Sequence, residues 1–92
     1  MITISVKLKD DNYMPKVDTA FVELAGMEKI KDGEYSSNKD VMRDCYCAAK
    51  ALMKREWFRN IVISMVWKVG KEPEDDLVPF FNERLKKYGC LH

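Results

Sequence analysis

Residues 2–9 set the start of the fold, and they read Ile2-Thr3-Ile4-Ser5-Val6-Lys7-Leu8-Lys9, with apolar and polar side chains in strict alternation. Successive side chains of a β-strand point to opposite faces of the sheet, so this period of two predicts a strand with one buried and one solvated face. Turn-forming residues and Pro15 follow and end the strand. A sheet that is apolar on one face needs a second layer, which the rest of the chain must supply.

Further segments are predicted to join this sheet. Residues 17–25 are interpreted as a second strand that returns antiparallel to the first. Residues 27–31 either extend that strand beyond Gly26 or form a short third strand before a turn at Asp32-Gly33. Residues 61–69 are apolar or β-branched at nearly every position. They are therefore predicted to form the most buried strand, at the centre of the sheet.

Two helices are also predicted. The first begins at Asn38 or Lys39 within a cluster of N-cap residues, and because no Gly or Pro precedes Asn60 it can run about 20 residues to a left-handed cap there. Its apolar stripe recurs at spacings of three and four: Val41, Met42, Cys45, Ala49, Leu52 and Met53. The second helix begins after Asp76 and ends at Gly89.

Together these elements predict one α+β domain over residues 1–92, since a chain of this length can bury one core and not two. We expect the order strand, strand, helix, strand, helix (ββαβα) and a sheet of three or four strands, antiparallel or mixed. The long helix packs across one face, and a short helix ends the chain. No apolar run approaches the ~20 residues that cross a bilayer, and the first residues lack the features of a signal peptide. We therefore expect a soluble, cytoplasmic protein with no membrane role.

Charge is distributed unevenly behind a formal net charge of +1. Residues 38–71 carry eight Lys and Arg against three Asp and Glu, whereas the segments on either side each carry two more acidic than basic residues. At 100° per residue, Arg43, Lys50 and Lys54 share one face of the first helix, opposite the apolar stripe. We expect this basic ridge to contact phosphates or acidic side chains of a partner. The alternative is an ordinary solvated helix face.

Other cations are candidates for the same contact. Lys39 lies near the ridge at the start of the predicted helix, and Arg59 lies near its end. Lys7 and Lys9 lie on the wet side of the first strand and form a second basic area.

Residues that usually carry catalysis are sparse. Cys45, Cys47 and Cys90 suit neither a disulfide framework nor a zinc site, so we expect Cys45 in the core and Cys47 at the surface. His92 is the only histidine and ends the chain, which makes it a poor general base. No Gly-rich phosphate loop follows a strand. We expect no catalytic residue, metal, cofactor or small-molecule substrate.

Aromatic residues raise the question of a partner surface. Trp57-Phe58 and Phe80-Phe81 are successive pairs, so on a helix one member of each must be exposed or cover the end of the core. Beside Arg59 and Arg84, exposed rings suit an interface. Trp67 shares the parity of Ile61, Ile63, Met65 and Val69 and is expected in the core.

At class level the chain resembles small phage-encoded anti-CRISPR proteins, through its length, its compact strand-strand-helix-strand order and its lack of catalytic residues. These features cover the whole chain but include no diagnostic motif. The resemblance implies a stoichiometric inhibitor that binds a CRISPR effector complex and blocks target DNA. Some such proteins present acids in place of DNA phosphates, which here points to Glu72, Glu74, Asp75 and Asp76. Others contact guide RNA or effector directly, for which the basic ridge is the better candidate.

Three function classes are left open by the sequence. The favoured one is a non-catalytic binding protein that docks a large protein or ribonucleoprotein complex through its basic helix. A stand-alone nucleic-acid-binding domain and a small metal-assisted enzyme using clustered carboxylates are the alternatives. The pattern does not indicate an oligomeric state.

Overall fold

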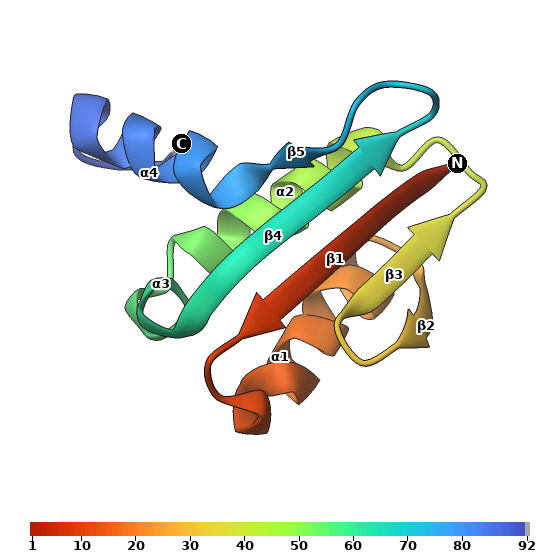
Figure 1. Ribbon diagram of the computed structural model, residues 1–92, viewed down its shortest axis with the longest axis horizontal. Helices are drawn as coiled ribbons and strands as arrows, with labels where there is room; N and C mark the ends of the chain where they lie inside the picture. Colours follow the sequence, from red (N-terminus) through yellow and green to blue (C-terminus); the bar gives the residue numbers. More distant parts are fainter. Residues whose placement is uncertain (92) are drawn as a thin grey trace.

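Five antiparallel strands form one sheet in the computed structural model, which describes residues 1–91 (Figure 1). The strands are β1 (Ile2–Leu8), β2 (Glu28–Lys31), β3 (Glu34–Ser37), β4 (Val62–Val69) and β5 (Asp75–Asp76), in the spatial order β2-β3-β1-β4-β5. The α+β class is confirmed. The expected count of three or four strands is wrong, because residues 28–37 form a hairpin of two strands and β5 adds another. The prediction for His92 lies outside the described residues.

β1 is the middle strand and has the predicted alternation. Ile2, Ile4, Val6 and Leu8 are buried, whereas the residues between them are partly or fully exposed. β1 pairs with β3 on one side and with β4 on the other. Figure 1 shows α1 and α2 behind the strands, so the buried face of β1 lies against helices and its front face is open.

β4 is neither the central nor the most buried strand, which corrects the prediction for residues 61–69. Only Val62 and Met65 of this strand are buried. A register shift opposite Lys7 and Leu8 leaves Ile63 without a paired residue, and its side chain is 55% exposed. The shift breaks the alternation, because one inserted residue reverses the facing of the side chains beyond it.

Residues 17–25 are helical and form no strand, which corrects the predicted order ββαβα. Residues 11–24 form η1 (Asp11–Tyr13), α1 (Met14–Asp18) and the π-helical turn η2 (Thr19–Leu24), and the last two of these cover residues 17–24. Pro15 stands in the first turn of α1, where its missing N–H is not needed. Val17, Phe21 and Ala25 are buried at spacings of four. The spacing of four between these apolar residues is typical of a helix and is already visible in the sequence.

The long helix predicted from Asn38 is two helices, α2 (Met42–Met53) and α3 (Glu56–Ile61). Arg55 between them has an extended backbone, with φ −86° and ψ 124°. The change of direction lets Phe58 enter the core. Asn60 lies inside α3 and is not a left-handed cap, because among the described residues only glycines have positive φ.

The last helix, α4 (Leu77–Tyr88), has the predicted ends. The side chain of Asp76 accepts a hydrogen bond from the N–H of Val78 at 3.0 Å, and Gly89 closes the helix with φ 77°. Phe81 fixes α4 to the rest of the molecule, since it is fully buried and its ring centroid lies 5.3 Å from that of Tyr46 on α2. α4 therefore extends the helical layer from α2 toward the β5 edge (Figure 1).

The turn between β2 and β3 lies at Asp32-Gly33, as predicted. Gly33 has φ 79°, and its carbonyl accepts a hydrogen bond from the N–H of Val6 at 2.7 Å. A Cβ atom at this position would collide with the carbonyl oxygen of Val6. Glycine is required here by both its backbone conformation and the close approach of β1.

Candidate functional site

The basic ridge lies on the outer face of α2. Arg43 and Lys54 are exposed, and Lys50 is half-buried with its Nζ 5.7 Å from the ring centroid of Tyr46. The opposite face of the helix buries Cys45, Ala48, Ala49, Leu52 and Met53. The predicted orientation of the ridge is therefore confirmed. Its contact with a partner stays a prediction.

The sequence predicts that Lys39 and Arg59 lie on the same helix as the ridge, and this prediction is wrong. α2 begins only at Met42, so Lys39 lies exposed in the preceding loop. Arg59 belongs to α3, and its guanidinium donates a hydrogen bond to the carbonyl oxygen of Met53 at 2.7 Å. This bond satisfies a carbonyl at the end of α2, which gives Arg59 a structural role.

Lys7 and Lys9 belong to a different part of the surface. Lys7 is exposed on the face of β1 opposite Val6 and Leu8, and the exposed Lys68 of β4 lies on the same open face, paired with Thr3. Because α2 lies behind the sheet in Figure 1, these lysines and the basic ridge do not face the same way. The structure therefore separates the two predicted basic areas.

The four acidic candidates also divide into two groups. Glu72, Glu74 and Asp75 are exposed and line a groove of about 450 Å³ together with Trp67. Asp76 instead accepts hydrogen bonds from the N–H groups of Met65 at 3.1 Å and Val78 at 3.0 Å. Its carboxylate is engaged in joining β4 to the start of α4, and only the other three acids are open to a partner.

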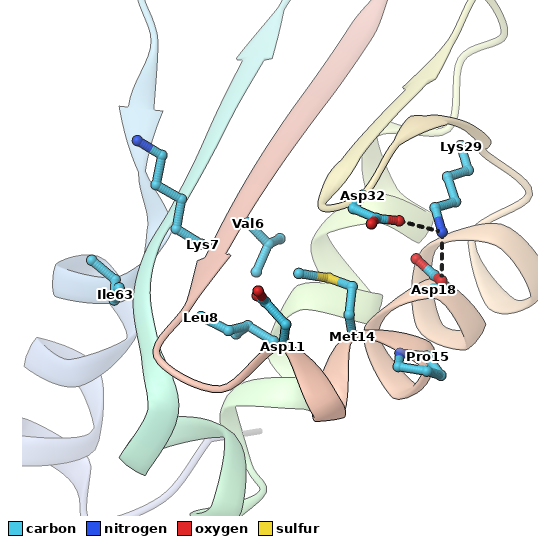
Figure 2. Close-up of a pocket in the computed structure, with 10 residues that line it drawn as sticks. All are labelled: Val6, Lys7, Leu8, Asp11, Met14, Pro15, Asp18, Lys29, Asp32 and Ile63. Atoms are coloured by element: carbon cyan, nitrogen blue, oxygen red, sulfur yellow. Dashed lines mark hydrogen bonds and ion pairs between the residues drawn. The ribbon is translucent and has the colours of Figure 1, made fainter.

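A cavity of about 620 Å³ lies between the end of β1, α1 and the β2–β3 turn (Figure 2). Figure 2 shows the ammonium group of Lys29 between two carboxylates, and its Nζ lies 2.9 Å from Asp18 Oδ2 and 3.0 Å from Asp32 Oδ1. The hydroxyl of Tyr35 donates to the other oxygen of Asp18. The positive charge of Lys29 is therefore balanced by the carboxylates of Asp18 and Asp32.

Two groups of this cluster hold their protons more firmly than usual. Hydrogen bonds to Asp18 and Asp32 raise the pKa of Lys29, and burial together with the Asp18 hydrogen bond raises the pKa of Tyr35. Both groups keep their protons, so neither acts as a general base. No group of three or more His, Cys, Asp or Glu side chains within residues 1–91 is arranged to hold a metal ion. Sequence reasoning missed the cluster because its members come from separate elements with no fixed spacing.

The successive aromatic pairs divide as predicted. Phe58 and Phe81 are fully buried, whereas Phe80 is 38% exposed. Trp57 is partly buried and stacks on Tyr13 with ring centroids 5.2 Å apart.

Trp67 is half-buried at the margin of the core. Its expected place inside the core is therefore correct only in part.

No protein-family model matches the chain, and comparison with curated proteins finds no match either. Within residues 1–91 no helix combines the length and the apolar character needed to cross a membrane.

Proposed function

We propose that this protein is a non-catalytic binding protein that docks onto an anionic surface of a large protein or ribonucleoprotein complex through the basic ridge of α2. The observation that carries the proposal is the state of Arg43 and Lys54. Both are exposed, Arg43 on the outer face of α2 and Lys54 at the C-cap position of that helix, and neither forms an ion pair with a carboxylate of residues 1–91. Exposed cations that form no ion pair within the described residues are available to phosphates or carboxylates of a partner.

The distribution of ion pairs supports the same surface. The three ion pairs of the described chain involve Lys29 and Lys31, which belong to β2 at the far edge of the sheet. Arg43 and Lys54 take part in none of these three pairs. A net charge of +1 is too low for indiscriminate binding to duplex DNA, which favours a composite partner over free nucleic acid.

The class-level resemblance to anti-CRISPR proteins makes the proposal more specific. The partner is then a CRISPR effector complex with its guide RNA in the host cytoplasm, and docking blocks the entry of target DNA. In this version the ridge contacts guide phosphates or acidic side chains of the effector. The exposed acids Glu72, Glu74 and Asp75 provide the alternative contact, in which carboxylates occupy the place of DNA phosphates.

The test is a capture experiment with charge-reversed bait proteins. The triple variant Arg43→Glu, Lys50→Glu and Lys54→Glu is compared with wild type in lysate from the host, with and without nuclease. The matched control is Lys68→Glu, Lys71→Glu and Lys86→Glu, which changes the net charge equally at exposed positions outside both the basic ridge and α2. We expect the ridge variant to lose the captured complex and the control to retain it.

Thermal unfolding of all three proteins separates binding from folding, since the substituted ridge positions lie outside the core cluster. Retained capture by a folded ridge variant contradicts the proposal. Loss of capture only on reversal of Glu72, Glu74 and Asp75 moves the contact to the acidic groove.

A further inference from the structure

α4 carries a row of alternating aromatic and cationic side chains that the basic ridge does not include. Phe80, Arg84 and Tyr88 are spaced by four and so lie on one face of the helix. The Cζ atom of Arg84 lies 5.3 Å from the ring centroid of Phe80 and 5.9 Å from that of Tyr88. The Nζ atom of Lys87 lies 5.3 Å from the Tyr88 ring. We call Phe80, Arg84, Lys87 and Tyr88 the α4 strip.

Both rings of the strip are open to solvent. Phe80 is 38% exposed and Tyr88 is 58% exposed, while Phe81 beside them fills the core. A groove of about 240 Å³ runs along these side chains and includes Glu83. Since Phe81 already fixes the helix, the strip has ring faces and cations that packing does not require.

The strip is continuous with the basic ridge. The ring centroid of Tyr46 on α2 lies 6.3 Å from that of Phe80, and the Nζ of Lys50 lies over the same Tyr46 ring. A small hollow of about 50 Å³ between the two helices is lined by Lys50 and Tyr46 on one side and by Arg84 and Tyr88 on the other. The two helices therefore present one surface on which rings and cations alternate.

We propose that this α2–α4 surface binds a single-stranded segment of nucleic acid. Its cations match the phosphates, and its exposed rings and the Arg84 guanidinium plane match the faces of unpaired bases, which stack on such groups with little dependence on sequence. A duplex offers the same phosphates but keeps its base faces stacked inside. The inference rests on the proposed function, in which α2 meets an anionic partner, and it adds that the anionic part carries accessible bases.

The test measures binding of fluorescently labelled oligonucleotides of about 12 nucleotides by anisotropy, a length within the usual site size for one domain. Single-stranded RNA, single-stranded DNA and a blunt duplex are compared at salt concentrations from about 50 to 200 mM. We expect both single strands to bind at least about tenfold more tightly than the duplex. A difference in affinity between single-stranded RNA and single-stranded DNA then identifies which nucleic acid the surface binds.

Ring removal gives the decisive variant. Phe80→Leu with Tyr88→Leu keeps apolar bulk and should weaken single-strand binding by about tenfold or more, with the salt dependence little changed because the phosphate contacts remain. Tyr13→Leu is the matched control, since Tyr13 forms another cation–ring pair, with Lys16, away from α4. Arg84→Lys keeps the charge without the planar group and should also weaken binding, which tests the strip if the double variant unfolds.

Equal binding of duplex and single strand overturns the inference, and so does unchanged binding by folded ring and Arg84 variants. If the wild type captures a protein complex from nuclease-treated lysate and the ring variant does not, the rings contact protein, and this result overturns the inference. If the ridge variant loses its partner while the ring variants bind normally, the inference fails and the proposed function stands. If neither set changes binding, both fail.

Discussion

The hydroxyl of Tyr35 donates a hydrogen bond to the carboxylate of Asp18 and so joins strand β3 to the end of helix α1. Tyr35 is fully buried, and its ring lies 5.1 Å from that of Phe21. The second oxygen of Asp18 accepts from Lys29 on β2. One carboxylate thus links the helical layer to two strands of the sheet edge.

Tyr35→Phe should lower the free energy of unfolding by about 1–2 kcal/mol, because it removes a partly buried hydrogen bond to a charged acceptor while the ring still fills the core. Urea unfolding at pH 7 measures the change. A double-mutant cycle with Asp18→Asn isolates the pair, since the coupling energy excludes what each substitution does alone. A coupling energy near zero would show that the bond contributes nothing to stability.

How far the sequence specifies this fold differs from segment to segment. The alternation of β1 and the caps Asp76 and Gly89 were predictable, because each depends on neighbours along the chain. Residues 17–25 were not assigned correctly, although Val17, Phe21 and Ala25 carry a period of four. Short amphipathic segments fit both periods, and tertiary packing decides between them.

Other features depend on contacts that no local pattern records. The break at Arg55 has no Gly or Pro to mark it and is stabilised by the hydrogen bond from the Arg59 side chain to the carbonyl of Met53. The orientation of the basic ridge followed from helical geometry, whereas its continuity with the α4 strip required the packing of Tyr46 against Phe80 and Phe81.

Alkaline pH should destabilise the protein through Cys45. Burial raises the pKa of this thiol from 9.0 to about 12, so above pH 9 the unfolded chain loses a proton that the folded protein keeps. The stabilisation is complete below pH 9 and decreases as pH rises toward 12, by about 1.4 kcal/mol for each pH unit. Urea unfolding from pH 8 to 10 should show this slope.

Cys45→Ala is expected to flatten that slope, even though it lowers stability at every pH by leaving a small void. The exposed Cys47 provides the control, and Cys47→Ala should leave the slope as in wild type. An unchanged slope in Cys45→Ala contradicts the assignment. Tyr35 adds a similar loss above pH 10, because its pKa is also raised in the folded protein, and this loss should persist in both cysteine variants.

Arg59→Ala should destabilise the junction between α2 and α3 by about 1–2 kcal/mol, because the carbonyl of Met53 loses its charged donor. Arg55→Ala is the matched control, since Arg55 is an exposed arginine of the same junction with no side-chain hydrogen bond within residues 1–91. Arg59→Lys should be intermediate, as a lysine keeps the charge but not the planar donor group. Equal unfolding free energies for Arg59→Ala and Arg55→Ala would show that the hydrogen bond of Arg59 does not stabilise the junction. Arg59 would then be a candidate for contact with a partner.

Asp76→Ala should destabilise the protein by about 1–2 kcal/mol, because one carboxylate oxygen caps α4 through Val78 and also accepts from the N–H of Met65 on β4. Asp75→Ala is the control one position away, where the side chain is exposed and makes no hydrogen bond within the described chain. Asp76→Asn should restore much of the loss, since asparagine is an equally good N-cap. Chemical unfolding monitored by tryptophan fluorescence, to which Trp57 and Trp67 both contribute, measures the change. Identical midpoints for Asp76→Ala and Asp75→Ala would mean that the acidic cluster acts only as a solvated surface, with all four carboxylates open to a partner.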